Sequence, residues 1–513
     1  MNILWFRRDL RLNDNESVFL ATANNAEVLP CFIIDPWFYQ KWADIGFSRV
    51  RFLFESLENL DANLRKLGSR LYLFEGEAAT VIKELTTQLI SQNQKPKLYF
   101  NRDVQVEYGI ERDQAIANFY KNLNLDFHIG LNNFIQADDN HRDEWFNQYY
   151  TYQRESIYPQ PNQINTPQLT LNLPQLSFAE LKQKYRVFWE TEKIYFPGGE
   201  TNANSTLNSF LTKRFYGYHW KLSRPWLAQK GATSHLSPHL TFGTISVRQV
   251  YQATKRRAEE LAAQPKAGFT LKAFRDRLRW HDSFNQRLYF HPEVAHTNRF
   301  PEFDELYTPA DLNPEKQELF QAWQSGQTGF PMVDASMRQL KDMGWMNFRM
   351  RAMCATFLTI NCGISWHHGA KHYMNYLVDG DLAIDNWQWQ MQAGVTNPLS
   401  DTFRIYNPTK NIEERDADLS FIYHWIPELQ GYSLPSILEG AYLEKSSYPK
   451  QMLDWGKTRK VNGKVVSDLR KRVRERIILQ GGEEFENAVA AKKTVDSYWK
   501  SKDKQYQDAI GNE

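Results

Sequence analysis

Three hydroxyl side chains lie close together near the middle of the chain. Thr233, Ser234 and Ser237 precede Val247–Leu261, where apolar residues recur at helical spacing. Hydroxyl groups and the unpaired N–H groups at a helix start bind a diphosphate well, because the donors and the positive end of the helix dipole face the anion. The same residue types also cap helices. The segment alone therefore leaves two interpretations, a diphosphate site and ordinary helix capping.

The aromatic residues are the second feature that could take part in chemistry. The chain contains 16 Trp, 25 Tyr and 32 Phe. A large aromatic core is one explanation of such a content. Stacking around a flat cofactor, or electron transfer from ring to ring, is the other. The positions of these residues, and not their number, distinguish the two explanations.

Short apolar runs in the first 130 residues predict strands that are buried in a parallel sheet. Between the second and third runs, apolar residues at helical spacing predict a helix over Ser48–Leu67, which Gly68 ends. This alternation predicts a doubly wound α/β domain over residues 1–133. The GxGxxG dinucleotide fingerprint does not follow the first run. The runs are Ile3–Phe6, Val28–Ile34, Arg70–Phe74 and Lys97–Phe100.

The remainder of the chain divides by composition. Residues 134–196 are irregular and rich in Asn, Gln and Pro, which predicts a connector between domains. Residues 197–430 have helical patterns throughout and predict an all-α domain. Residues 431–513 are polar and charged, and Val465–Leu479 predicts a basic amphipathic helix with a solvated face. The clearest helices of the all-α part are Thr206–Phe215, Val247–Leu261, Leu271–Leu288 and Met337–Leu358.

Composition excludes several classes of protein. Lys+Arg 62 against Asp+Glu 60 leaves a net charge of +2, so any contact with DNA must use a local basic patch. Cys31, Cys354 and Cys362 are too far apart for a CxxC zinc motif and too few for a four-cysteine iron–sulfur cluster. The start of the chain does not have the pattern of a signal peptide, and no apolar run reaches about 18 residues. We therefore expect a cytoplasmic protein without a membrane segment, and the sequence does not indicate its oligomeric state.

Seven motifs, in the same order and spacing, resemble the photolyase/cryptochrome family from residue 1 to about 430. The resemblance implies an α/β antenna domain, an all-α FAD-binding domain and a flavoprotein driven by blue light. The chain resembles a divergent bacterial-type member, neither a typical cyclobutane-dimer photolyase nor a typical (6-4) photolyase. The motifs are WFRRDLRLNDN (Trp5–Asn15), GGETNA (Gly198–Ala203), TSHLSPHLTFG (Thr233–Gly243), WQSGQTGFPMVDASMRQL (Trp323–Leu340), GWMNFRMRAM (Gly344–Met353), DGDLAIDNWQWQ (Asp379–Gln390) and FRIYNP (Phe403–Pro408).

This resemblance implies a set of flavin contacts. Arg351 and Asp379 match an ion pair beside the flavin ring, where the arginine would stabilise negative charge on the reduced ring and the carboxylate would hold the arginine in place. A plain buried salt bridge is the alternative. Asp381 would accept from flavin N3–H or contact the sugar chain. The contacts toward the diphosphate fall on Tyr218, Thr233, Ser234, Leu236 and Ser237.

One departure from the family concerns the residue that faces flavin N5. Most repair photolyases have Asn at this position, whereas counting back from FRIYNP places Asp385 there, as in plant-type cryptochromes. A carboxylic acid can give a proton to N5 once the ring has accepted an electron, and an amide cannot. Burial would raise the pKa of Asp385 and keep it protonated near neutrality. A register shifted by one residue would place Asn386 there instead.

A second departure concerns the pocket that holds a thymine dimer in repair photolyases. Trp280 is kept, but Arg277 replaces an acidic residue, Phe348 replaces Asn, Ala352 replaces Met and Met391 replaces Trp. The paired histidines of (6-4) photolyases are absent near Phe348. These changes weaken both stacking on a dimer and hydrogen bonds to its bases.

Other family features are retained. Arg349 and Arg404 match arginines that contact DNA phosphates, so DNA binding stays open. Trp389 and Trp366 match the first two members of the row of tryptophans that carries electrons from the surface to the flavin. The third position falls near Tyr307, with Trp387 as a substitute. An antenna pigment is also implied, and Asp103–Asp113 resembles deazaflavin binders more than folate binders.

Three functions follow from these observations. The first is a cryptochrome-type photoreceptor that signals to a protein partner, and Asp385 and the altered pocket favour it. The second is a light-dependent DNA photolyase with a rebuilt pocket, for another lesion or for single strands, which would make the chain a DNA repair enzyme. The third is a light-independent flavin-binding module, and Trp366 and Trp389 argue against it.

Overall fold

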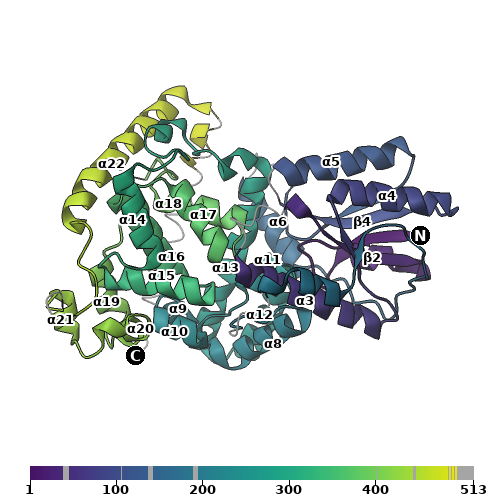
Figure 1. The fold of residues 1–513 in the computed structure, drawn as a ribbon, viewed down its shortest axis with the longest axis horizontal. Helices are drawn as coiled ribbons and strands as arrows, with labels where there is room; N and C mark the ends of the chain where they lie inside the picture. The colour runs from purple at the N-terminus through teal and green to yellow at the C-terminus, as the bar shows by residue number, and fades with distance from the viewer. Residues whose placement is uncertain are drawn as a thin grey trace.

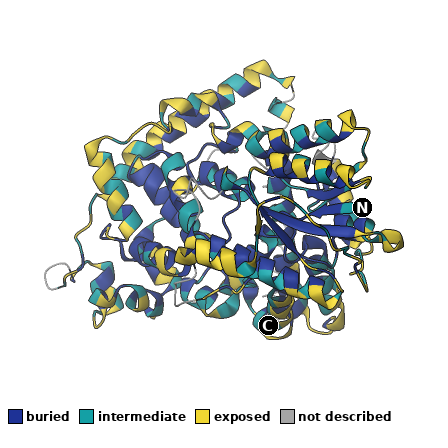
Figure 2. Ribbon diagram, turned by 45° about the vertical axis from the view of Figure 1, so that its right-hand side comes forward, coloured by how far each residue is buried: buried dark blue, intermediate teal, exposed yellow. Residues whose placement is uncertain are grey.

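The computed structural model describes residues 1–37, 46–104, 107–136, 142–188, 194–400, 403–442 and 446–482, with positions 484–486, 488–489 and 492–493. A mostly parallel sheet lies at one end of the molecule and a larger group of helices at the other (Figure 1). The strands are buried, whereas exposed residues lie on the outer faces of the helices (Figure 2). Within the described residues, no helix combines the length and hydropathy that a membrane span requires.

The α/β domain contains one six-stranded sheet in the order β5-β4-β1-β2-β3-β6. β1 to β5 pair in parallel, and β6 pairs antiparallel with β3. Side chains of β1 alternate between the faces, so that Leu4 packs with α3, and Ile3 and Trp5 pack with α4 and α5. Helices cover both faces, which confirms the predicted doubly wound fold. The elements are β1 (Asn2–Trp5), α1 (Glu16–Ala21), β2 (Val28–Ile34), α3 (Phe47–Lys66), β3 (Tyr72–Glu75), α4 (Ala78–Ser91), β4 (Lys97–Arg102), α5 (Glu107–Asn122), β5 (Phe127–Leu131) and β6 (Gln175–Leu176).

The helical domain surrounds one large core, which contains Trp323, Trp366 and Trp389. It confirms the predicted all-α part of the chain. Three π-helical turns interrupt or follow its helices, at Phe210–Arg214, Ala228–Ala232 and Phe357–Asn361. The helices are α8 (Glu200–Ser209), α9 (Tyr218–Lys221), α10 (Pro225–Leu227), α11 (Ser237–Thr241), α12 (Val247–Glu260), α13 (Pro265–Phe290), α14 (Pro314–Ser325), α15 (Pro331–Met343), α16 (Phe348–Thr356), α17 (Trp366–Tyr376), α18 (Leu382–Gln392), α19 (Pro408–Arg415), α20 (Ser420–Trp425), α21 (Leu434–Leu438) and α22 (Trp455–Gln480).

The single helix predicted over Met337–Leu358 is wrong. Gly344 has a φ of 64° and ends α15, because a left-handed residue cannot continue a helix. Asn347 then begins α16, and its side chain accepts from Met350 N at 3.3 Å. The break turns α16 so that it carries Arg351 toward α18.

The C-terminal helix is less solvated than its charge suggested. One side of α22, with Val466, Leu469, Val473 and Ile477, belongs to the core that contains Trp389. Arg470 is buried and donates to the carbonyl oxygens of Gly394, Thr396, Asn397 and Ser400. The helix therefore closes one side of the helical domain, along the edge of the molecule in Figure 1.

The predicted connector contains regular structure. α6 (Arg142–Arg154) packs against α12, and Gln153 donates to Asp282 on α13 at 3.2 Å. β6 completes the sheet, and α7 (Phe178–Lys184) begins with Ser177 as its cap. The domain boundaries predicted from composition stay predictions.

The loop after β1 joins the two domains. Leu12 N and Asn13 N donate to the Glu200 carboxylate at 3.0 and 3.1 Å, and Arg11 donates to the Gly243 carbonyl oxygen at 3.0 Å. Gly243 has a φ of +62°, and a Cβ there would lie 2.1 Å from the Arg8 carbonyl oxygen. Only glycine permits this approach of backbone to backbone.

Candidate functional site

The start of α18 brings three carboxylates together. Asp381 caps the helix by accepting from Ala383 N and Ile384 N at 3.1 and 3.3 Å. The backbone N–H of Asp381 donates in turn to Oδ2 of Asp385 at 2.8 Å. Asp379 stands two residues before the cap and pairs with Arg351. All three acids are buried, so their charges must be paired or neutralised.

Arg351 holds the first of these acids. Its Nη2 donates to both oxygens of Asp379, at 2.9 and 2.8 Å, and its Nε donates to the Met346 carbonyl oxygen at 2.8 Å. Nη1 has no hydrogen-bond partner among the described residues, so it can donate to a bound molecule. The predicted ion pair is thus present, with one donor of the arginine available beside Asp385.

Asp385 is the acid without an arginine hydrogen bond among the described residues. It is 6% exposed. Burial raises the pKa of Asp385 to about 7; the Arg351 charge and the hydrogen bond from Asp381 N oppose this shift, and the Asp379 and Asp381 charges add to it. The carboxyl group therefore holds a proton in a substantial fraction of molecules at neutral pH. Because Oδ2 accepts from Asp381 N, the proton belongs on Oδ1.

Asn386 is engaged elsewhere. Its side-chain amide donates to the Ala295 carbonyl oxygen at 2.6 Å, which directs it to the turn Pro292–Ala295. Of the two candidates for the position at N5, only Asp385 shares the cluster of Arg351 and Asp379 in the described residues.

The hydroxyl segment has a different setting from the one expected. Ser237 begins the short helix α11, whereas Ser246 caps α12 by accepting from Gln249 N at 2.9 Å. Arg214 binds the carbonyl oxygens of Gly231, Thr233 and Ser234, which fixes the loop. The helix that follows the hydroxyl segment is therefore α11 and not α12, and the diphosphate site at this segment stays a prediction.

Two residues of the predicted site carry a buried donor that could bind a ligand. The Thr233 hydroxyl has no hydrogen-bond partner among the described residues, and neither does Nε1 of Trp389. A buried polar atom without a partner costs free energy of about 1–3 kcal/mol. An anionic, hydrogen-bonding ligand beside Thr233 would remove that cost. Thr241 links the loop to the acids, since its hydroxyl donates to the Asp379 carbonyl oxygen at 3.2 Å.

Tyr218 and Leu236, the remaining predicted flavin contacts, are buried in a core cluster, and their contact with the flavin stays a prediction. Tyr218 is buried between the rings of Phe210 and Phe274, each at 5.5 Å between centroids. Leu236 belongs to the same core cluster. A cavity of about 240 Å³ is lined by residues that include Arg214, Ser205, His235 and His239. It includes neither Thr233 nor the acids of α18.

The aromatic row is only partly as expected. Trp389 on α18 lies 4.7 Å from the Tyr373 ring and 6.2 Å from Trp323, two buried neighbours that family motifs alone did not assign to it. Trp366 is buried, donates to Asn298 at 2.8 Å and stacks on His367 at 3.8 Å.

Tyr307 does not reach the surface. It is 1% exposed, and its hydroxyl donates to the Ala393 carbonyl oxygen at 3.0 Å. Its burial does not suit the surface end of an electron path, because a terminal donor must exchange electrons with solution, and its place as the third member of the path stays a prediction. Trp387 is half-buried, with the Arg287 guanidinium 4.6 Å from its ring centroid, and is the better placed of the two candidates.

The predicted lesion residues form a row of alternating side chains. The Arg277 guanidinium lies 5.0 Å from the Trp280 ring and 4.9 Å from the Phe348 ring. Arg349 lies 5.5 Å from Phe348 and 5.6 Å from Tyr406. Phe348 is 39% exposed, so the row reaches the surface. Arg404 interacts electrostatically with Arg349, and Met391 is partly buried near the end of α18.

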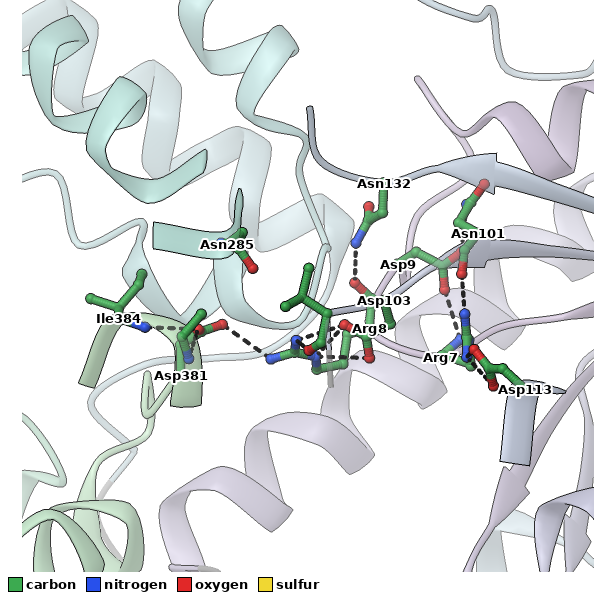
Figure 3. Close-up of polar contacts among 12 residues, drawn as sticks. Arg7, Arg8, Asp9, Asn101, Asp103, Asp113, Asn132, Asn285, Asp381 and Ile384 are labelled. Carbon is green, nitrogen blue, oxygen red and sulfur yellow. Dashed lines mark hydrogen bonds and ion pairs between the residues drawn. The ribbon is translucent and has the colours of Figure 1, made fainter. Parts of the chain in front are cut away.

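Sequence reasoning missed two arginines that come from the α/β domain. Arg8 donates to Asp381 at 3.1 Å, as Figure 3 shows, and Arg49 on α3 lies against Gly380. The signal for Arg8 was its position directly after a strand of a parallel sheet, where the carboxyl ends of strands form sites.

Two family models and several known proteins match the chain. A family model described as the FAD binding domain of DNA photolyase matches residues 274–468. A model described as DNA photolyase matches residues 2–154. The chain is 31% identical over 471 residues to the deoxyribodipyrimidine photo-lyase of a Synechococcus species, covering 88% of this chain and 93% of that protein.

The chain is also similar to a cryptochrome and to a solved photolyase structure. Cryptochrome DASH of Gloeobacter violaceus is 30% identical over 452 residues, covering 84% of this chain and 86% of that protein. The crystal structure of an archaeal photolyase from Sulfolobus tokodaii with two FAD molecules superimposes with a TM-score of 0.74 at 27% identity. It covers 92% of this chain and 100% of the other.

Proposed function

The chain belongs to the photolyase/cryptochrome family and carries its FAD-binding domain, and from this premise we propose that it is a cryptochrome-type photoreceptor. In this proposal Asp385 supplies the proton that follows light-driven electron transfer, and Trp389 and Trp366 lie on the electron path. The observation that carries the proposal is the buried carboxyl group of Asp385, whose pKa is raised to about 7.

Different residues of this chain have different roles toward FAD. FAD, when bound, supplies blue-light absorption and accepts an electron. Arg351 presents its Nη1 to the ligand while Asp379 fixes the guanidinium. Thr233 offers an unpaired hydroxyl to the diphosphate. Asp385 holds a proton on Oδ1, and Asp381 N orients the carboxyl group through Oδ2.

The pH dependence of the light reaction tests this proposal. Below its pKa Asp385 is protonated and able to donate, and above it the proton is lost. In blue light with a thiol, the broad yellow-to-red absorbance of flavin protonated at N5 should be greatest at acidic pH. It should fall to half near the pKa of about 7. A yield that stays constant within about one pH unit on each side of that value would assign the proton to another donor.

A second function is supported by the row of Trp280, Arg277, Phe348, Arg349 and Tyr406. Alternating aromatic and arginine side chains suit the stacked bases and phosphates of single-stranded nucleic acid. This favours a photolyase with a rebuilt pocket as the alternative to a receptor. DNA contact through this local basic surface is compatible with either function.

A repair assay separates the two functions. Because Arg277 covers the Trp280 ring, a dimer must displace the guanidinium before it stacks. We therefore expect no repair above a dark control when dimer-containing single- or double-stranded DNA is illuminated with the FAD-loaded protein. Repair of either substrate under blue light would establish the enzyme and reject the receptor as the main function.

Other assignments stay proposals. An antenna pigment in the α/β domain is one of them; of the segment assigned to it, Asp103 and Asp113 already bind Arg8 and Arg7. A signalling protein partner and a cytoplasmic location are two more.

A further inference from the structure

Arg8 connects three parts of the molecule. It follows β1, and its Nε and Nη2 donate to Asp103, after β4, at 2.6 to 3.1 Å. Nη2 also donates to the Val104 carbonyl oxygen at 3.1 Å. Nη1 crosses the domain boundary and donates to Oδ2 of Asp381 at 3.1 Å. The guanidinium thus fixes one acid in each domain, as Figure 3 shows.

Asp381 connects Arg8 to Asp385 through hydrogen bonds. One of its carboxylate oxygens caps α18, the other accepts from Arg8, and its N–H donates to Asp385. The Asp381 side chain is 5% exposed and the Arg8 side chain 26%, so solvent screens this partly buried pair less than it screens a surface pair. A shift of Asp381 would therefore move both the first turn of α18 and the orientation of the Asp385 carboxyl group.

The charges around Asp385 explain why Arg8 matters. Arg351 pairs with Asp379, and Arg8 pairs with Asp381, which leaves Asp385 as the third acid. Arg49 from α3 lies against Gly380 and acts on all three acids. Tyr373 on α17 faces Asp385, and His281 on α13 faces Asp381 and Arg8. Without Arg8, the Asp381 charge next to Asp385 would lose its ion-pair partner and keep only the more general influence of Arg49.

We propose that Arg8 is a positioning residue through which the α/β domain holds the proton-donating acid Asp385 and sets the pH range in which it carries a proton. The inference rests on the proposed role of Asp385. It assigns to the WFRRDLRL motif a task at the flavin site, 373 residues away along the chain. A change in the α/β domain near Asp103 would then reach the flavin site through one side chain.

The test is a titration of Asp385 in the dark in the full-length, FAD-loaded protein. The infrared C=O band of its protonated carboxyl group is isolated by subtracting the spectrum of the same variant that also carries Asp385→Asn. Arg8→Gln should raise the midpoint of this titration by about one pH unit, because the uncompensated Asp381 charge disfavours ionisation of its neighbour. Arg8→Lys should restore most of the wild-type midpoint, since it returns the charge.

Arg7→Gln is the matched control. Arg7 precedes Arg8 in the same loop and loses the same charge, but its side chain pairs with Asp113 and the Asn101 carbonyl oxygen inside the α/β domain. In the Arg7→Gln variant, the midpoint of the Asp385 titration should stay near that of the wild type. Asp103→Asn, a second variant, should lower the midpoint, because Arg8 then acts on Asp381 alone.

Equal midpoints for Arg8→Gln and Arg7→Gln would overturn the inference. Failure of Arg8→Lys to restore the midpoint would also overturn it, because the shift would then come from disturbed packing. The dark titration does not depend on light chemistry. If Asp385 proves not to donate to N5, the titration still decides whether Arg8 controls its pKa, so the two failures are distinguishable.

Discussion

Asp385→Asn is expected to abolish proton delivery to flavin N5 in blue light while FAD stays bound. The amide is nearly isosteric with the carboxylic acid, and its oxygen can still accept from Asp381 N, as Oδ2 of Asp385 does at 2.8 Å. It carries no acidic proton, however. Under blue light with a thiol, the yellow-to-red absorbance of N5-protonated flavin should be lost at every pH, and reduction should end with N5 unprotonated.

Asp416→Asn serves as the matched control for this experiment. Asp416 is also buried with a pKa raised to about 7, but it accepts from Phe421 N and Ile422 N at the start of α20. Its replacement should leave N5 protonation unchanged. If the Asp385 variant still forms N5-protonated flavin at the wild-type rate, another group donates the proton.

Asp385→Asn should also change the free energy of unfolding, in a direction that follows from the raised pKa of Asp385. A folded-state pKa near 7, above the ordinary value of about 3.9, means that the native protein binds the Asp385 proton more tightly than the unfolded chain. Ionisation therefore destabilises wild type increasingly as pH rises from about 4 to 7, by on the order of 4 kcal/mol. Asp385→Asn removes this term, so its melting temperature relative to wild type should increase with pH.

Trp389→Phe is expected to slow photoreduction about tenfold or more, equal to about 1.4 kcal/mol in the barrier. Phenylalanine is far harder to oxidise than tryptophan, so the first ring of the electron path no longer passes an electron. The fold should tolerate the change, because Nε1 of Trp389 donates no hydrogen bond to a described residue, and its removal therefore breaks none. The rate of flavin reduction under constant blue light measures the effect.

Trp145→Phe is the control for the loss of a buried tryptophan. Trp145 also has a buried Nε1 without a described partner, but it lies on α6 in a separate aromatic cluster. Its replacement should leave photoreduction at the wild-type rate. Equal rates in Trp389→Phe and wild type would move electron entry to another route, with Tyr373, 4.7 Å from Trp389, as the next candidate.

The fold was predictable where one local pattern determined an element. The buried strands β1 to β4 and helix α3 follow from apolar runs and helical spacing. β5 and β6 were missed, because β5 has a mostly half-buried surface and β6 has only two residues. The helix over Met337–Leu358 failed because its apolar pattern continues across Gly344, and only the backbone reveals the break.

The candidate site, too, was only partly predictable from the sequence. Asp379, Asp381 and Asp385 are close in sequence, so their grouping could be anticipated. The position of Arg8 after a strand was a signal for a site, but its partner Asp381 could not be assigned, because the contact depends on how two domains pack. Tyr307 was assigned by its place in a row, but its burial depends on the surrounding helices.

The closure of the helical core by α22 affects the order in which the chain folds. Val466, Leu469, Val473 and Ile477 are synthesised after the residues that they cover, and Arg470 binds carbonyl oxygens of residues 394–400 only when α22 arrives. Until then one side of the tryptophan-containing core stays open to solvent on the ribosome. The α/β domain does not depend on this helix and can fold first. During synthesis, the helical domain is thus the part that needs protection from aggregation, and it completes its folding after translation of residue 480.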